Sequence, residues 1–243
     1  FPVPSSPDLI IFCGQDWWYH NRAHSDFQLM TRAAKYRKVL LINSIGMRMP
    51  MPGRSPLPWK RIWRKLKSML RHTRRPLVEA PNYTVMTPVL FPFYGSEKAR
   101  AFNARSIRSQ VERQARKLGI KDPHILVTVP TAWDVAKEMQ HSSLVYNRSD
   151  KHSAFSEADQ GLIRGLEHEL LTRADGVLYS SRAFRDSERE LTGDRAHFLD
   201  HGVDTKHFAP RGRTEALASF DCKRPIIGFF GGLDDYVIDF DLL

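Results

Sequence analysis

The stretch Leu9-Ile-Ile-Phe-Cys-Gly14, followed by Lys38-Val-Leu-Leu-Ile-Asn43, decides the fold of this chain. Both runs are short and almost wholly apolar, as expected of strands that are buried on both faces. The segment between them, residues 25–35, carries apolar residues at Phe27, Met30 and Ala34, which is a helical period. We therefore expect a strand, a helix and a parallel strand at the start of the chain.

The same alternation continues to residue 199. Further strands are predicted at residues 82–87, 124–129, 143–146, 176–180 and 197–199. Helices are predicted at residues 97–118, ended by Gly119, at 157–173, capped by Ser156, and at 183–191. The predicted fold class is α/β, with a doubly wound, mostly parallel, Rossmann-like sheet.

The chain is predicted to pass from one α/β domain into another after this sheet. His201-Gly-Val-Asp204, Phe208 and Pro210 precede a polar spacer, and an apolar run then breaks at Gly231-Gly232. We expect a Rossmann-like domain over residues 1–209, a linker over 210–223, and the first strand and turn of a second α/β domain over 224–243.

Composition excludes several classes of protein. The chain has 243 residues, 42% of them hydrophobic, which is ample for a packed core. Its two cysteines, Cys13 and Cys222, cannot by themselves form a disulfide framework or a zinc site. The first seven residues lack the pattern of a signal peptide, and no apolar run approaches the roughly 20 residues that span a bilayer. We expect a soluble, cytoplasmic protein.

The net charge of +10 is concentrated in one region. No acidic residue lies between Asp26 and Glu79, whereas fourteen basic residues do. They are Arg32, Lys35, Arg37, Lys38, Arg48, Arg54, Lys60, Arg61, Arg64, Lys65, Lys67, Arg71, Arg74 and Arg75. Because these fourteen exceed the whole surplus, the remainder of the chain is mildly acidic, and a local anionic partner is indicated.

Within this region, residues 59–75 have the pattern of an interfacial amphipathic helix. Apolar residues recur at helical spacing, basic residues fill the opposite face, and Pro58 suits a helix start. We predict reversible docking on anionic lipid at the inner face of the cell membrane. The membrane-binding residues would be Trp59, Lys60, Arg61, Trp63, Arg64 and Lys67. The same stripe could instead pack on the sheet with its basic face solvated, or bind nucleic acid.

Ligands of doubly wound sheets bind at the carboxyl ends of the strands, where the strand order reverses. The residues that follow the predicted strands are therefore the candidates: 15–18, 44–46, 130–133, 147–152, 180–182 and 201–204. No strand is followed by G-x-G-x-x-G, and no G-x-x-x-x-G-K-[ST] occurs. A dinucleotide oxidoreductase and a P-loop enzyme are therefore disfavoured.

Several of these stretches resemble a known family. Gln15-Asp-Trp17 with Arg22-Ala-His24, Val145-Tyr-Asn-Arg-Ser-Asp150, and Glu167-His-Glu169 running to Ala174-Asp175 and the next strand are similar to motifs of GT-B glycosyltransferases. His201-Gly-Val-Asp204 and Ile227-Gly-Phe-Phe-Gly-Gly232 resemble the hinge and the first donor-domain strand. The likeness is to the N-terminal half of the GT4-like bacterial enzymes. Asn147 and Arg148 depart from the family pattern, which has an acidic and a small residue there.

The resemblance implies transfer of a sugar from a UDP- or GDP-linked donor to a cell-envelope or exopolysaccharide acceptor, which can be lipid-linked. It also implies a metal-independent, retaining reaction with no cofactor. The donor-domain motif of basic and glutamate residues is absent, so we expect these residues to be an incomplete and inactive piece of such an enzyme. The alternatives are a non-catalytic interaction or regulatory protein and a basic nucleic-acid-associated protein.

The candidate site residues follow from the strand ends and the resemblance. Asp16, His24, Asp150 and His152 are the catalytic candidates. Acceptor binding is expected of Gln15, Trp17, Arg22, Thr131, Asn147 and Arg182, and Gly202, Asp204, Gly231 and Gly232 would line the donor cleft. For the two aspartates the competing interpretation is local turn capping, and for the histidines a structural or solvated role. No metal-binding cluster is evident.

Overall fold

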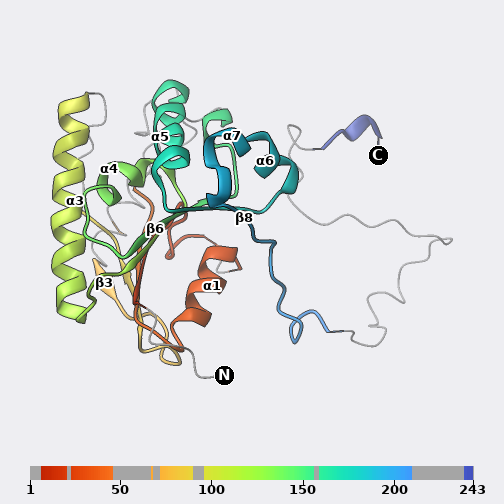
Figure 1. Ribbon diagram of the computed structural model, residues 1–243. Helices are drawn as coiled ribbons and strands as arrows, with labels where there is room; N and C mark the ends of the chain where they lie inside the picture. The colour runs from red at the N-terminus through yellow and green to blue at the C-terminus, as the bar shows by residue number, and fades with distance from the viewer. Residues whose placement is uncertain are drawn as a thin grey trace. The chain divides into compact units, whose positions relative to one another are not determined.

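The computed structural model describes residues 7–20, 23–45, 67, 72–89, 96–155, 159–209 and 238–242. The chain divides into two compact units, Phe1–Gly202 and Val203–Leu243. The first unit is an α/β domain (Figure 1). Of the second, the structure describes residues 203–209 and a short 3-10 helix, η4 (Phe240–Leu242). The predicted boundaries at residues 209 and 223 stay a prediction.

The first unit is built on an eight-stranded sheet with the order β3-β4-β2-β1-β5-β6-β7-β8. The strands are β1 (Leu9–Phe12), β2 (Val39–Ile42), β3 (Thr73–Arg74), β4 (Tyr83–Met86), β5 (His124–Val127), β6 (Ser143–Arg148), β7 (Gly176–Tyr179) and β8 (Ala196–Phe198). All pairs are parallel except β3 with β4. The predicted doubly wound α/β class is confirmed, and all seven predicted strands are present.

Two sequence predictions were wrong in this sheet. Strand β3 was not expected, because Thr73 and Arg74 were assigned to the end of the amphipathic helix at residues 59–75. They instead pair antiparallel with Met86 and Val85. The other error concerns β6, which runs on to Arg148 rather than ending at residue 146.

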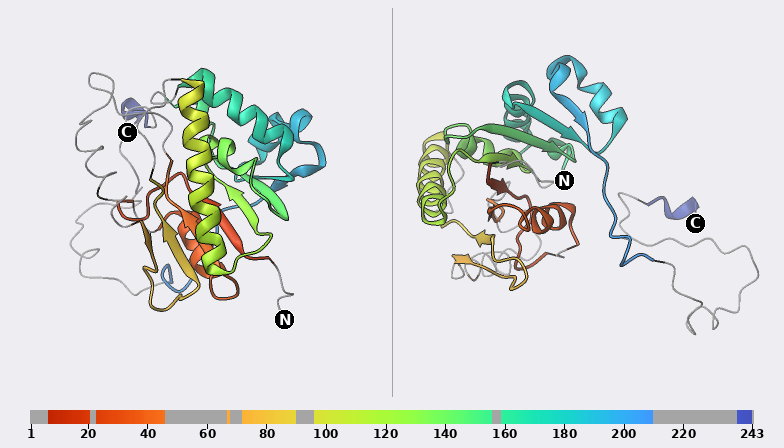
Figure 2. Two further views of the ribbon diagram at one scale, coloured as in Figure 1. Left: turned by 90° about the vertical axis from the view of Figure 1, so that its left-hand side faces the viewer. Right: turned by 60° about the horizontal axis from the view of Figure 1, so that its bottom comes forward.

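Helices cover both faces of the sheet (Figures 1 and 2). They are α1 (Ser25–Ala33), α3 (Glu97–Leu118), α4 (Trp133–Ala136), α5 (Gln160–Arg173), α6 (Arg182–Ser187) and α7 (Arg189–Thr192). Short 3-10 turns lie at η1 (Pro130–Ala132), η2 (His152–Ala154) and η3 (Gly193–Arg195). Helix α5 is capped by Asp159, whose side chain accepts from the Leu162 amide. The predicted cap, Ser156, lies outside the described residues. The helix predicted over 183–191 is divided into α6 and α7.

The alternation of strand side chains creates two cores. On one face, Phe27 and Met30 of α1 pack against Ile11, Leu41 and Val85. The opposite face holds α3, α4 and α5, whose apolar side chains pack on the neighbouring positions of the same strands. We call these the α1 face and the α3 face.

The strand order reverses between β1 and β5, so this is the switch point of the sheet. The carboxyl ends of the strands lie nearly level there, since Phe12 is opposite Ile42 and Val127, and Val127 is opposite Tyr146. The residues that follow these four positions therefore form a common rim.

Gly119 ends α3 as predicted, with a φ of 67° in the left-handed region. We expect Gly119→Ala to lower the free energy of unfolding by about 1 kcal/mol, because a Cβ is strained at this φ. Gly165→Ala is the matched control, since it lies within α5 with nothing within 4 Å of an added Cβ. It should raise the free energy of unfolding by about 0.5–1 kcal/mol in urea titrations. Equal effects of the two changes would contradict this account of the helix end.

Candidate functional site

Polar side chains form a row on the α1 face of the carboxyl rim. Each lies one position beyond the aligned strand residues, on the same face as the α1 core because strand side chains alternate. The row consists of Thr87, Asn43, Cys13, Thr128 and Asn147. Asn43 Nδ2 donates to Thr87 Oγ1 at 2.8 Å, and the Gly14 amide donates to Thr128 Oγ1 at 2.9 Å. The row thus crosses the switch point.

Asp26 joins this row from the first turn of α1. Its Oδ1 accepts from Asn147 Nδ2 at 3.3 Å, and its Oδ2 is 3.7 Å from the thiol of Cys13. Burial raises the pKa of Asp26, while hydrogen bonds from Thr128, Cys13 and Asn147 oppose that shift. Burial also raises the pKa of Cys13, so the thiol stays protonated. The carboxyl group therefore lies among neutral donors.

Sequence reasoning missed Asp26, which it used only to mark the start of the basic region. A signal was present, because a first-turn carboxylate on the helix that follows the strand at the switch point must lie near the rim. Cys13 and Thr128 were missed for a related reason: as single polar residues directly after apolar runs, they were assigned to the strands themselves.

The α3 face of the same rim is organised by Arg148, which is 1% exposed. Its guanidinium pairs with Glu188 of the α6–α7 junction, with NH2 2.9 Å from Oε1, and with Glu167 of α5. It also donates to the Tyr146 hydroxyl at 3.3 Å, and its Cζ lies 4.7 Å from the centre of the Phe184 ring. Tyr179 donates to Glu188 Oε2 at 2.9 Å. The sequence assigned Arg148 to a loop, whereas the structure makes it the centre of a buried ion-pair network.

This network holds the loop that carries Asp150 and His152. Arg148 NH1 donates to the Asp150 carbonyl at 2.8 Å, and the Ser153 amide donates to Glu167 Oε1 at 3.3 Å. His152 is buried, and its Nδ1 lies 3.9 Å from Glu167 Oε1 with no hydrogen-bond partner. Burial lowers the pKa of His152, which favours the neutral imidazole. The Asp150 carboxylate is exposed and accepts from the Ser149 hydroxyl at 3.1 Å.

The turn after β1 has the geometry of local capping. Asp16 is 8% exposed, and its Oδ1 accepts from the Trp18 amide at 2.9 Å. Trp17 lies in the α1-face core, with its ring centre 5.0 Å from those of Phe27 and Tyr83. The Gln15 carbonyl accepts from the Ser44 amide at 3.3 Å. Catalysis by Asp16 and acceptor binding by Gln15 and Trp17 stay predictions.

The remaining predicted site residues are spread around the rim. His24 is the exposed N-cap residue of α1 and lies near enough to Asp26 to influence its pKa. Thr131 lies in η1 with a buried hydroxyl that has no hydrogen-bond partner. Arg182 begins α6, and its Cζ lies 4.0 Å from the centre of the Phe198 ring.

The hinge residues divide between the two units. Gly202 is exposed at the end of the first unit, and Asp204 belongs to the second, where its carboxylate accepts from the amides of Lys206 and His207 at 3.1 Å. Lys67 is helical and exposed. The other predicted residues lie outside the described part of the chain: Arg22, Trp59, Lys60, Arg61, Trp63, Arg64, Gly231 and Gly232.

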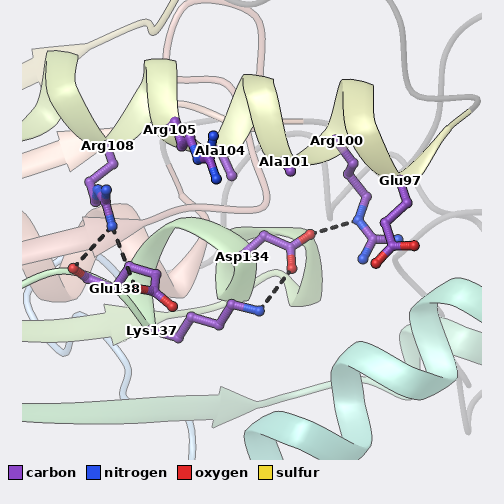
Figure 3. A pocket seen from close by; sticks show the side chains of 9 residues that line it. All are labelled: Glu97, Arg100, Ala101, Ala104, Arg105, Arg108, Asp134, Lys137 and Glu138. Atoms are coloured by element: carbon purple, nitrogen blue, oxygen red, sulfur yellow. Dashed lines mark hydrogen bonds and ion pairs between the residues drawn. The ribbon is translucent and has the colours of Figure 1, made fainter.

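A groove of about 370 Å³ between α3 and α4 is a different kind of surface (Figure 3). Arg100 Nε is 2.8 Å from Asp134 Oδ2, Lys137 Nζ is 3.4 Å from Asp134 Oδ1, and Arg108 is 3.6 Å from Glu138. Most of these charged side chains pair with one another, so few of them are left to bind a charged ligand. Within the described ranges, no group of three or more His, Cys, Asp or Glu side chains is placed to hold a metal ion.

No family model matches this chain, and no curated protein does. A solved structure of a sucrose-phosphate synthase from Thermosynechococcus elongatus is similar to it, with 11% sequence identity and a TM-score of 0.46. The match covers 84% of this chain and 93% of that one. At this identity and TM-score the similarity does not bear on function.

The buried network predicts a large effect of Arg148→Met. Removing the guanidinium leaves Glu167 and Glu188 without a counter-charge, and we expect the free energy of unfolding to fall by about 3–5 kcal/mol in urea titrations. Arg173→Met is the control, because Arg173 pairs with Glu169 on the exposed side of α5 and should change stability by less than about 0.5 kcal/mol.

The triple variant Arg148→Met, Glu167→Gln, Glu188→Gln separates charge from packing. It should recover part of the loss, since no unpaired charge stays buried. A single variant as stable as the wild type would contradict the proposed role of the network.

Proposed function

We propose that this chain supplies the acceptor-binding half of a GT-B glycosyltransferase of the GT4-like group. The donor is a UDP- or GDP-linked sugar, and the acceptor is a saccharide of the cell envelope or of an exopolysaccharide, free or lipid-linked. In the reaction the bond between the anomeric carbon and the nucleoside diphosphate breaks. The acceptor oxygen forms the new bond, and its proton leaves with the diphosphate.

The observation that carries this proposal is the chemistry of the switch point. A nucleotide-binding switch point presents glycine amides and the positive end of a helix to phosphate. Here the turn after β1 contains Asp16 and the bulky Trp17, and the first turn of α1 already holds the carboxyl group of Asp26. A carboxyl group at this helix end leaves less favourable electrostatics for phosphate there. The rim therefore suits a neutral, hydroxylated ligand, which is the acceptor of a glycosyl transfer.

We assign the phosphates to Gly231 and Gly232, where backbone can approach the diphosphate closely. Gly202 and Asp204 are the other predicted donor-side residues, and the Asp204 carboxylate is not assigned to the phosphates. His24, Asp150 and His152 would orient the acceptor hydroxyl, and Asn147, Thr131 and Arg182 would bind the remainder of the acceptor. By the resemblance, the transfer uses no metal ion and retains the anomeric configuration. The Arg148 network supports this arrangement because it fixes the loop that carries Asp150 and His152.

Saccharide binding tests the proposal directly. The 243-residue chain is applied to an array of bacterial oligosaccharides, including polyprenyl-linked ones, and retained saccharides are titrated in solution. We expect a hydroxyl-rich saccharide to bind, and Asn147→Ala or His152→Ala to weaken it at least tenfold, about 1.4 kcal/mol. UDP- and GDP-sugars should bind far less. Retention of nucleotide sugars with no retained saccharide would contradict the assignment of this half to the acceptor.

We further propose that the basic region docks the protein on anionic membrane. No described helix is long and apolar enough to cross a bilayer. Lys67, the described residue of this stretch, is exposed. Each basic residue near an anionic surface contributes on the order of 1 kcal/mol, so a few of them hold the protein reversibly. A lipid-linked acceptor would be reached from this position.

Vesicle flotation tests the docking. The chain should float with phosphatidylglycerol-containing vesicles at low salt, and be released by 0.5 M NaCl, because the attraction is screened. Reversing Lys60, Arg61, Arg64 and Lys67 to Glu should reduce the bound fraction at least tenfold. Reversing Arg113, Arg116, Lys117 and Lys121, around the end of α3, alters net charge equally and should have a smaller effect. Equal flotation with neutral phosphatidylcholine vesicles would contradict docking by charge.

A further inference from the structure

We propose that Asp26 is the hydroxyl-binding residue of the acceptor site, and that with Asn147 and Thr128 it binds neighbouring hydroxyl groups of a neutral sugar at the β1/β5 switch point. The inference rests on the proposed function and deepens it, because Asp26 is placed by the fold and not by any motif.

Four elements converge on this carboxyl group. Cys13 follows β1 and Thr128 follows β5. Asn147 is the second-last residue of β6, and Asp26 lies in the first turn of α1. The β1–β5–β6 register places the first three side chains level with one another and on one face. Asp26 lies within hydrogen-bonding reach of all three. The arrangement is therefore fixed by the sheet, as a binding site requires.

The site is partly accessible to solvent. Asp26 is half-buried, and so are Asn147, Val145 and Leu178, which lie on the α1 face of β6 and β7. The core of this face, by contrast, is almost fully buried under α1. Asp26 therefore lies at the border between a closed core and an accessible part of the sheet.

The hydrogen-bond donors and acceptors of Asp26 and Asn147 match two neighbouring hydroxyl groups of a sugar. A carboxylate only accepts hydrogen bonds, whereas the Asn147 amide both donates and accepts, and a hydroxyl does the same. In the described residues, no Lys or Arg forms an ion pair with Asp26; its hydrogen-bond donors are the neutral Cys13, Asn147 and Thr128, and His24 lies nearby. A carboxylate has about four lone-pair positions, so these partners leave capacity for a further donor. Two adjacent sugar hydroxyls fit these groups: one would donate a hydrogen bond to Asp26, and the other would accept one from Asn147.

The burial of Asp26 also lowers the stability of the fold. The pKa is raised chiefly by burial, so the unfolded chain releases the proton at a lower pH than the folded protein does. Stability therefore falls as pH rises from the ordinary aspartate range through the folded pKa. Above the ordinary aspartate range, the carboxyl group therefore lowers the stability of the fold. Residues of this kind persist where function needs them.

The test is Asp26→Asn, titrated with methyl glycosides of glucose, galactose, mannose and N-acetylglucosamine. Against the glycoside that the wild type binds best, we expect at least tenfold weaker binding. The melting temperature at pH 7.5 should be unchanged or higher, because an amide avoids the desolvation of the carboxyl group. Asp134→Asn is the matched control: it removes a first-turn carboxylate from α4 on the opposite face and should leave glycoside binding unchanged.

The outcomes separate this inference from the proposed function. If Asp26→Asn binds the glycosides as tightly as the wild type, the role of Asp26 is overturned while acceptor binding stands. A lower melting temperature together with weaker binding would assign Asp26 a structural role and would also overturn the inference. If the wild type binds no glycoside and no saccharide, the proposed function fails and this inference fails with it.

A measurement on the unaltered protein keeps the proposal testable if the variant does not fold. The side-chain amide signals of Asn147, assigned by comparison with Asn147→Asp, should shift during titration with the bound glycoside. That shift follows from the hydrogen bond that Asn147 shares with Asp26. Unchanged Asn147 signals at saturating glycoside would overturn the proposal.

Discussion

The buried guanidinium of Arg148 is the interaction on which the carboxyl rim depends. Removing a charge from water costs several kcal/mol, so it must be matched by partners in good geometry. Here those partners come from α5, as Glu167, and from the α6–α7 junction, as Glu188. Because Arg148 also donates to the Asp150 carbonyl, the ion pairs determine where the following loop begins. Helix α5, the α6–α7 junction and the loop after β6 are thus held by one side chain.

The two-residue period of a strand gives β6 two roles at its end. Asn147 points to the α1 face and reaches Asp26, whereas Arg148 points to the α3 face and pairs with Glu167 and Glu188. The pairing on one side therefore fixes the position of the polar side chain on the other. A slip of one residue in β6 would exchange them, placing the cation under α1 and the amide among carboxylates. The ion pairs consequently specify the strand register as well as the loop.

The sequence predicts the sheet well because its central strands are continuous apolar runs. Such runs are typical of strands that are buried on both faces of a parallel sheet. It predicts the end of α3 because Gly119 is suited to a left-handed cap. It does not predict β3, since Thr73 and Arg74 become a strand only through pairing with β4 at the sheet edge. Nor does it predict that Arg148 is buried, because an arginine after an apolar run is ordinarily exposed. Only the tertiary positions of Glu167 and Glu188 reverse that expectation.

Arg148 and Asp26 are two ionisable residues at the carboxyl rim of the sheet, and their surroundings differ. Arg148 is surrounded by opposite charges that offset its burial, so its position is explained by the stability of the fold. Asp26 accepts hydrogen bonds from neutral side chains and lies near His24, yet burial raises its pKa because these interactions do not fully offset the desolvation. An amide of the same shape at position 26 would avoid part of this desolvation. Asp26 is therefore the better candidate for contact with a ligand. Arg148 is the better candidate for the scaffold that positions the site.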